Sequence, residues 1–291
     1  MLTSCFPGRE REELSTAYIG SREKYDVYSP YFRKLRKNKL IFSSLEGALS
    51  GDSDIAFCDI EFSNKPAYIL LLLEQGKDVF LTYPIGNSLG EYAAVSDFKE
   101  KYGRIIGMLN PLMFYPSIEM LKNIIDWDSI AIEEIRVSCH PTDLGDGFLV
   151  SGSAGSVQPL ERVISFISGS YPLQLLAKES NTPGVELNYE SFTSYIHPDP
   201  RQQGWNMEID GDGFNARADH TGLLAINNEV EPRLSPDPGV LDDSIIRNLE
   251  DFMHSLRDRS EPRVNSLDGL ASIVLNNAVE KSLETGSAID L

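Results

Sequence analysis

The sequence predicts an α/β protein in two parts: a parallel sheet with helices on both faces, then an open, mostly antiparallel sheet with helices on one face. Two observations predict this class. Up to about residue 116, short apolar runs alternate with helical patterns, which is typical of parallel strands joined by crossover helices. Beyond it, longer strand patterns are separated by turns rich in Gly, Asp and Pro, which is typical of antiparallel strands. We therefore expect one domain over residues 1–116 and a second over residues 117–291.

Strand and helix patterns alternate throughout the first part. The predicted strands are 15–21, 39–44, 54–60, 78–82 and 104–109. The predicted helices are 29–37, 45–51, 66–76 and 89–103. Gly76 and Gly103 support two of the helix ends, because a glycine in the left-handed conformation commonly follows the last helical turn.

The second part begins with a predicted helix at 117–127 and then consists mainly of strands. The predicted strands are 130–140, 173–180, 185–196, 205–209, 214–219 and 222–227. Three further helices are predicted at 160–169, 242–257 and 266–284, and the proline-rich stretch 229–239 is predicted to be a loop.

Composition excludes several classes of partner. The formal net charge of -18 argues against nucleic acids and anionic membranes, since both require a basic surface. No apolar run approaches the ~20 residues needed to cross a bilayer, and the N-terminus does not resemble a signal peptide. The three cysteines are an odd number without metal-ligand spacing, which suits a reducing compartment. We expect a cytoplasmic protein.

Three segments in a fixed order, 54–86, 204–226 and 245–291, resemble the glucose–fructose oxidoreductase and inositol dehydrogenase family (Gfo/Idh/MocA). The resemblance covers the chain from about Ser15. It implies an N-terminal NAD(P)-binding, Rossmann-like domain and a C-terminal open antiparallel sheet. Members of the family commonly associate through the exposed face of that sheet, so the resemblance also implies a homo-oligomer. A sugar-like small molecule is the ligand that it implies.

The stretch KDVFLTYPIG, residues 77–86, holds the position of the family's Glu-Lys-Pro motif. Aligned on Gly76 and Pro84, Thr82 stands at the glutamate position and Tyr83 at the lysine position. In the family that lysine assists proton transfer at the carbon that exchanges hydride with the nicotinamide. Tyrosine can also donate a proton, but its reference pKa is ~10 and its neutral form carries no positive charge. Tyr83 is therefore the candidate catalytic residue, and the substitution fits either altered or lost catalysis.

The family's glycine-rich cofactor turn is the second candidate site. Its Gly-x-Gly-x-x-Gly lets the backbone approach the pyrophosphate, about 30 residues before the second strand. If residues 15–21 are that second strand, about fifteen residues precede it and Gly8 is their one glycine. We therefore expect a Rossmann-like domain that is shortened at its start and lacks the glycine-rich turn. The two Gly-Asp-Gly stretches, 145–147 and 211–213, are predicted to be hairpin turns.

Ser21 and Arg22 follow the strand at the point where the family often has an aspartate for the adenosine ribose. A Ser-Arg pair there would suit the 2′-phosphate of NADP. The alternative interpretation, which we favour without the glycine turn, is an ordinary strand-end turn with a solvated arginine.

The other site positions implied by the resemblance are also substituted. The family's Thr-Pro-Asn and histidine beside the nicotinamide correspond to Ile60, Glu61, Phe62 and Lys65. Met113 stands at an arginine position. Gly155 and Pro159 stand at the aspartate and histidine positions of the inner helix, and neither side chain can transfer a proton.

The remaining chemically active side chains form no recognisable site. His140 lies near Asp143 in a predicted turn, where a structural role is the more common one. The other histidines, His197, His220 and His254, are scattered, so no metal site is expected. Asp210 and Asp212 lack the further ligands of a calcium loop.

The combined substitutions indicate a non-catalytic binding, regulatory or scaffolding homologue of these oxidoreductases, with no cofactor. The alternative is an NAD(P)-dependent oxidoreductase of a sugar or polyol with a rearranged site. In that case Tyr83 is the proton donor, and Ser21 and Arg22 contact NADP. A third hypothesis is a structural subunit whose open sheet pairs with a partner.

Overall fold

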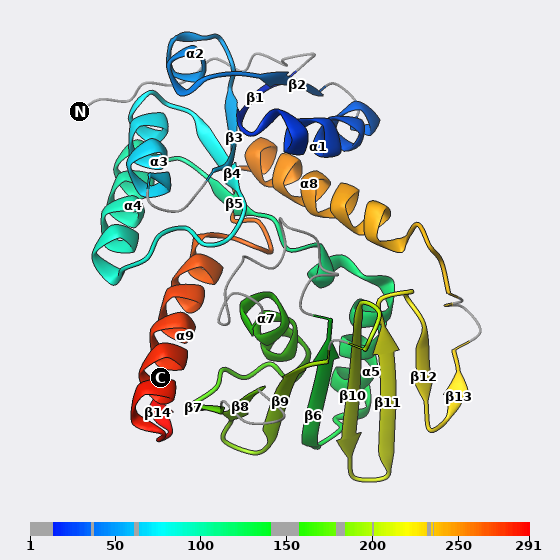
Figure 1. Ribbon diagram of the computed structural model, residues 1–291. Helices are drawn as coiled ribbons and strands as arrows, with labels where there is room; N and C mark the ends of the chain where they lie inside the picture. Colours follow the sequence, from blue (N-terminus) through cyan, green and yellow to red (C-terminus); the bar gives the residue numbers. More distant parts are fainter. Residues whose placement is uncertain are drawn as a thin grey trace.

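The computed structural model describes residues 14–35, 38–60, 64–140, 157–178, 184–199, 201–231, 234 and 236–291. These residues form a parallel sheet and a mainly antiparallel sheet, drawn one above the other in Figure 1. The two predicted sheet types are thereby confirmed. No helix in the described ranges is long and apolar enough to cross a membrane.

The parallel sheet has five strands in the order β2-β1-β3-β4-β5. They are β1 (Leu14–Gly20), β2 (Asn38–Phe42), β3 (Ile55–Asp59), β4 (Asp78–Leu81) and β5 (Ile106–Met108). The helices of this part are α1 (Arg22–Lys34), α2 (Leu45–Ser50), α3 (Lys65–Glu74) and α4 (Leu89–Tyr102). α1 packs beside α8 (Val240–Asp258) on one face of the sheet, and α3 packs beside α4 on the other (Figure 1). Successive strand residues alternate between the two apolar layers, as strand geometry requires.

Strand order identifies β1 as the strand at which the connections change direction. From β1 the chain passes to β2 on one side and then crosses to β3 on the other. The carboxyl ends of β1 and β3 therefore form a topological switch point, where open α/β sheets bind their ligands. The expectation that residues 15–21 form the second strand of the family's sheet is wrong. These residues form β1, which pairs with β2 and β3 and is therefore the first strand. The expectation rested on the short length of chain before this strand, which does not determine the position of a strand in a sheet. The counterpart of the glycine-rich turn is the turn after Gly20.

Local signals fix the helix ends as the sequence predicts. Gly76 and Gly103 have positive φ angles of 73° and 59°, and each follows a helix. α4 begins with a capping box in which the Ser88 hydroxyl accepts from the Glu91 N–H and the Glu91 carboxylate accepts from the Ser88 N–H. α1 is longer than predicted and begins immediately after β1, because Ser21 caps its first turn.

The second sheet has nine strands in the order β13-β12-β11-β10-β6-β9-β8-β7-β14, antiparallel except for the pair β6 and β9. They are β6 (Ile132–Cys139), β7 (Gln174–Lys178), β8 (Gly184–Asn188), β9 (Thr193–Pro198), β10 (Trp205–Gly211), β11 (Phe214–Asp219), β12 (Leu224–Ile226), β13 (Glu229–Val230) and β14 (Ile289–Asp290). The 3-10 helix η1 (Pro111–Phe114) leads from the first sheet into α5 (Pro116–Asp128). α5, α7 (Val157–Ser168) and α9 (Ser266–Thr285) contact this sheet.

Two details of the second sheet differ from the prediction. Residues 185–196 form two strands, β8 and β9, because the chain turns between Tyr189 and Phe192, whose rings stack with centroids 4.1 Å apart. The predicted loop at 229–239 begins with the short strand β13. The predicted hairpin turn at 211–213 is confirmed between β10 and β11, whereas 145–147 lies outside the described residues.

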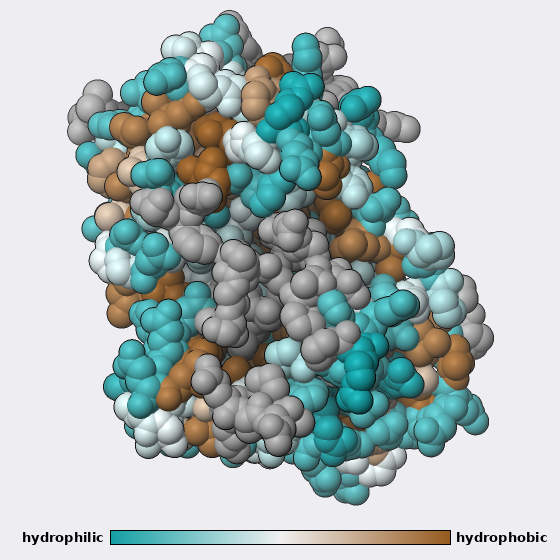
Figure 2. Space-filling model, in the orientation of Figure 1, coloured by the Kyte–Doolittle hydropathy of each residue, from teal (hydrophilic) through white to brown (hydrophobic). Residues whose placement is uncertain are grey.

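The exposed side chains of the central strands β6 and β10 are charged. Arg136 forms ion pairs with Glu134 on its own strand and with Asp210 on β10, the latter at 3.0 Å. On the side of the molecule seen in Figure 2, hydrophilic and hydrophobic side chains are interspersed. Trp127 at the end of α5 is the most exposed large apolar side chain among the described residues, at 88%.

Candidate functional site

The first βα turn keeps one glycine of the dinucleotide fingerprint. A Cβ atom on Gly20 would lie 2.6 Å from the Asp59 carbonyl oxygen and 2.6 Å from the Tyr18 hydroxyl, so no side chain fits there. Counted from Gly20, the second glycine position is Arg22 and the third is Tyr25. In dinucleotide-binding proteins the second glycine lets the backbone approach the pyrophosphate, and the third lets the helix pack closely on the strand.

A carboxylate lies buried at the switch point. Asp59, the last residue of β3, accepts hydrogen bonds from the hydroxyl of Tyr18 at 3.0 Å and from that of Thr82 at 3.0 Å. The ammonium of Lys24 on α1 pairs with the same carboxylate at 3.6 Å. Its side chain is only 4% exposed. The three donors come from α1 and from the ends of β1 and β4, so Asp59 holds the carboxyl edge of the sheet together.

Lys65 brings a second buried charge to this edge. Its ammonium donates to the Thr82 carbonyl at 2.9 Å and lies 3.5 Å from the Tyr83 carbonyl. Burial lowers the pKa of Lys65 to about 8, and the negative charge of Asp59 opposes that shift. The position at which the family has a histidine is thus occupied by Lys65, which hydrogen-bonds the backbone immediately after β4.

Arg22 extends from the start of α1 towards the carboxyl end of β2. Its guanidinium lies 4.9 Å from the ring centroid of Tyr25 and 5.3 Å from that of Phe42, the last residue of β2. It also pairs with Asp26 at 3.5 Å. Ser21 uses its hydroxyl to accept from the Lys24 N–H at 3.2 Å, so this side chain is engaged in capping α1.

A dinucleotide held in the usual way does not fit this turn. The Tyr25 ring packs against the sheet, with its centroid 5.6 Å from that of Tyr18 and 5.5 Å from that of Phe42. A pyrophosphate at the switch point would meet the Asp59 carboxylate, which has the same sign of charge. Arg22 replaces the glycine that would allow close approach of the backbone.

Tyr83 lies in the interior. It is 7% exposed, and its hydroxyl approaches the Asn110 side chain without making a hydrogen bond of ordinary geometry to any described residue. Burial raises the pKa of Tyr83 well above its ordinary value; Asp268 adds to this and Arg162 opposes it. Burial and the Asp268 carboxylate therefore both favour the neutral phenol.

The helix that carries the family's inner-helix positions contributes buried charges. Arg162 on α7 forms an ion pair with Asp268 in the first turn of α9. Glu161, 2% exposed, accepts a hydrogen bond from Ser165 on the next turn. Burial raises the pKa of Glu161 to about 7, while Ser165 and Arg162 lower it. These groups lie near Tyr83, and the ion pair links α7 to α9.

The structure separates the predicted site residues into two groups. Ser21 and Arg22 lie at the start of α1, while Tyr83 lies two strands away on the exit of β4, linked to that edge through Thr82 and Asp59. Of the other family positions, Met113 is fully buried, and Glu61, Phe62 and Gly155 lie outside the described residues.

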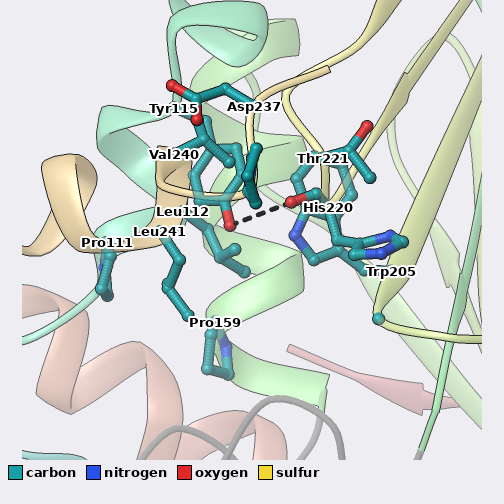
Figure 3. A pocket seen from close by; sticks show the side chains of 12 residues that line it. Pro111, Leu112, Tyr115, Pro159, Trp205, His220, Thr221, Asp237, Val240 and Leu241 are labelled. Atoms are coloured by element: carbon teal, nitrogen blue, oxygen red, sulfur yellow. Dashed lines mark hydrogen bonds between the residues drawn. The ribbon is translucent and has the colours of Figure 1, made fainter.

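A cavity of about 350 Å³ lies where η1, α7, the second sheet and α8 meet (Figure 3). Its walls include Pro159, at the family's histidine position, together with Tyr115, Trp205 and His220. The Tyr115 hydroxyl donates to the His220 carbonyl at 3.4 Å, shown as the dashed line in Figure 3. Burial raises the pKa of Tyr115 to about 12. The lining thus combines apolar side chains with the ring systems of Tyr115, Trp205 and His220.

The other described histidine and cysteine side chains do not form a metal site. No group of three or more His, Cys, Asp or Glu side chains that could hold a metal ion occurs among the residues described. Burial raises the pKa of Cys58 to about 12 and that of Cys139 to about 11, so both remain thiols. The partner considered for His140, Asp143, lies outside the described ranges.

The sequence analysis did not identify Asp59 as a residue of this edge of the sheet. It also did not place His220 in the lining of the cavity. Asp59 follows an apolar strand, and a polar residue at the carboxyl end of a parallel strand was the signal that could have found it. For His220 no local signal exists, because its neighbours in the cavity come from distant segments.

Solved structures show which fold this is. An oxidoreductase from Agrobacterium radiobacter, in complex with NAD+, L-tartaric acid and magnesium, matches with a TM-score of 0.80 at 15% identity, over 96% of this chain and 98% of that chain. Myo-inositol 2-dehydrogenase from Lactobacillus plantarum matches with a TM-score of 0.78 at 15% identity, over 96% and 100%. An apo scyllo-inositol dehydrogenase from Lactobacillus casei matches with a TM-score of 0.78 at 14% identity, over 96% and 98%.

No family model matches the sequence, and no curated protein matches it. The doubly wound sheet joined to an open antiparallel sheet is nevertheless the fold of these dehydrogenases. The chain has the Gfo/Idh/MocA oxidoreductase fold, and the resemblance seen in the sequence is confirmed at the level of fold.

Proposed function

We propose that this chain is a non-catalytic homologue of these oxidoreductases that binds a small molecule between its two sheets. The observation that carries the proposal is the buried Asp59 carboxylate at the switch point, held by Tyr18, Thr82 and Lys24. A working dehydrogenase needs that edge of the sheet for the anionic pyrophosphate of its cofactor. Here the Asp59 carboxylate is the anion at that edge, and the ammonium groups of Lys24 and Lys65 are the cations beside it.

The catalytic positions support the same proposal. Tyr83 is 7% exposed and is not among the described residues that line the cavity, and the Pro159 side chain has no proton to transfer. General acid–base catalysis requires a titratable group within hydrogen-bonding reach of the reacting atom. Neither position of the family's proton-transfer pair meets this requirement.

Calorimetric titration with NADH and NADPH tests the proposal. We expect no heat of binding and no shift in melting temperature at millimolar nucleotide. Binding at micromolar concentration would overturn the proposal, because such affinity requires a functional pyrophosphate site.

The alternative function is an NADP-dependent oxidoreductase of a sugar or polyol, and one observation favours it. The Arg22 guanidinium lies over Phe42 at the carboxyl end of β2, where an arginine accommodates the 2′-phosphate of NADP. Under this alternative NADPH binds, and Arg22→Ala weakens the binding of NADPH at least tenfold while the affinity for NADH stays unchanged. Arg33→Ala, at the other end of the same helix, is the matched control.

Two further expectations remain part of the proposal. The chain is expected to be cytoplasmic, and the buried Cys58 and Cys139, which are not joined in a disulfide, suit that location. Homo-oligomerisation through the second sheet would bring together charged faces that carry Glu134, Arg136 and Asp210. Such an interface would be sensitive to salt, so sedimentation at low and high ionic strength tests it.

A further inference from the structure

We propose that the outward side of α5 is a self-association surface. A second copy of this chain docks on it antiparallel, across a two-fold axis, so that the Trp127 side chain of each copy enters a groove of the other. The inference is independent of whether the chain binds a cofactor or a small molecule.

α5 has one buried and one outward side. Its buried residues are Ser117, Ile118, Leu121 and Ile125. On the outward side Met120, Ile124 and Trp127 follow one another at helical spacing, and they line a groove of about 470 Å³ together with Leu234 and Arg247. The apolar stripe of the helix is therefore wider than the part that the core covers.

This surface is separate from the charged face of the second sheet. Ile118 and Leu121 share an apolar core with Ile135 and Val137 of β6. Arg136 lies between these two strand residues and points to the opposite face, because side chains alternate along a strand. α5 thus covers the inner face of the sheet, and its groove opens on the side away from Arg136.

Trp127 is the projecting side chain of the surface. It is 88% exposed, although a tryptophan ring that is covered removes about 150–250 Å² from water. A two-fold contact requires one patch to present both a projection and a matching recess. The indole at one end of the groove and the apolar walls of Met120 and Leu234 meet this requirement.

The two ends of the groove favour an antiparallel second copy. At the start of α5 the Glu119 carboxylate pairs with both Arg247 and Arg263, and the Arg247 side chain is still 39% exposed. At the other end lie Asp128 and the last carbonyl groups of the helix, which carry negative charge. An antiparallel copy brings its Asp128 and its Trp127 ring to Arg247, where an ion pair and a cation–π contact form. A parallel copy would bring like ends together.

The size of the surface sets the strength of the contact. α5 has 13 residues and is about 20 Å long, so two such helices cover less than the ~800 Å² per partner of a stable dimer. The net charge of -18 on each copy opposes association further. We expect a reversible dimer with a Kd between about 10 µM and 1 mM.

Sedimentation equilibrium of the full chain, from about 10 µM to about 1 mM at about 150 mM salt, is the first test. The wild type is expected to form a monomer–dimer equilibrium. Trp127→Ala should weaken it at least about tenfold, and Asp128→Arg about 3- to 10-fold, because the new cation meets Arg247 of the other copy. All these changes are at exposed positions, and circular dichroism shows that each variant has folded.

Matched variants outside the groove serve as controls. Tyr171→Ala removes another exposed aromatic ring, 65% exposed, and Asp97→Arg makes the same charge change on α4. Arg136→Glu alters the charged face of the sheet. None of the three is expected to change the dimerisation constant.

Cross-linking tests the two-fold geometry. A residue midway between the two ends of the groove lies near the axis and faces its own copy, so Asn123→Cys should form an intermolecular disulfide with copper–phenanthroline as oxidant. Glu100→Cys, exposed on α4, should not. Both are made in a Cys5→Ser background, since Cys58 and Cys139 are buried.

Three results would overturn the inference. A wild type that remains monomeric at about 1 mM would leave the groove to a different partner. A dimer that Arg136→Glu disrupts and Trp127→Ala leaves intact would place the contact on the face of the sheet. Equal cross-linking of Asn123→Cys and Glu100→Cys would exclude the antiparallel two-fold arrangement.

Discussion

The hydroxyl of Tyr18 donates a 3.0 Å hydrogen bond to the carboxylate of Asp59, across the gap between the ends of β1 and β3. The two strands are paired in register, with Gly20 opposite Asp59. Parallel sheets of this type bind ligands in that gap. In this chain a hydrogen bond between its own side chains spans that gap.

Asp59→Ala is expected to lower the free energy of unfolding by about 1–3 kcal/mol, because it leaves the hydroxyls of Tyr18 and Thr82 without their acceptor. Urea denaturation measures the change. Asp26→Ala, which removes an exposed carboxylate from the i,i+4 pair with Arg22, is the control and should stay within about 0.5 kcal/mol. An equally small effect at Asp59 would show that the carboxylate is not structural.

The Arg162–Asp268 ion pair is expected to couple α7 to α9. Arg162→Met leaves the Asp268 carboxylate buried without its cation and should destabilise the protein by about 3 kcal/mol. A double-mutant cycle with Asp268→Asn should recover part of that loss, since the pair acts as a unit. The exposed Lys122–Asp126 pair on α5 provides a control cycle with a coupling of at most about 0.5 kcal/mol. Additive effects at Arg162 and Asp268 would contradict the coupling.

Glu161 should make stability depend on pH below neutrality. Its folded pKa of about 7 lies above the reference value of 4.5, so the folded state holds a proton that the unfolded chain has released. This contribution is fully present below pH 4.5 and is lost as pH rises through 7, a change of roughly 3 kcal/mol. Asp268 and Arg162 face the same group and are kept intact.

Denaturation of the wild type and Glu161→Gln at pH 5 and pH 8 measures this contribution. In Glu161→Gln the free energy of unfolding should no longer fall between pH 5 and pH 8 through this group. In Glu133→Gln, on the exposed face of β6, the fall should be the same as in the wild type. An unchanged difference in Glu161→Gln would show that other groups cause the pH dependence.

Lys65 should make the stability of the protein rise with pH in the alkaline range, opposite to the effect of Glu161. Its folded pKa of about 8 lies below the reference value of 10.5, so between these values the unfolded chain holds a proton that the folded state has released. The stability of the wild type relative to Lys65→Met should therefore rise by roughly 3 kcal/mol from pH 8 to pH 10.5. Guanidinium denaturation at both pH values checks this, with the exposed Lys34→Met as control. A constant difference between wild type and Lys65→Met would refute it.

Much of the fold could be predicted from local sequence. Apolar runs of four to seven residues marked β1, β3 and β4, and Gly76 and Gly103 marked the ends of α3 and α4. These signals are reliable because backbone conformation at a glycine and alternation along a strand depend on near neighbours in the chain. The substitution at Tyr83 was visible for the same reason, since it falls inside a motif fixed by Gly76 and Pro84.

The sequence by itself thus determined the two sheet types, most element boundaries and the replacement of the family's lysine and histidine. Only the tertiary structure decided that β1 is the strand beside the switch point, because strand order is set by pairing between distant segments. It also decided that Asp59 fills that point and that His220 and Pro159 share one cavity. These contacts join residues that are 41 and 61 positions apart in the chain, and no local pattern encodes such distances.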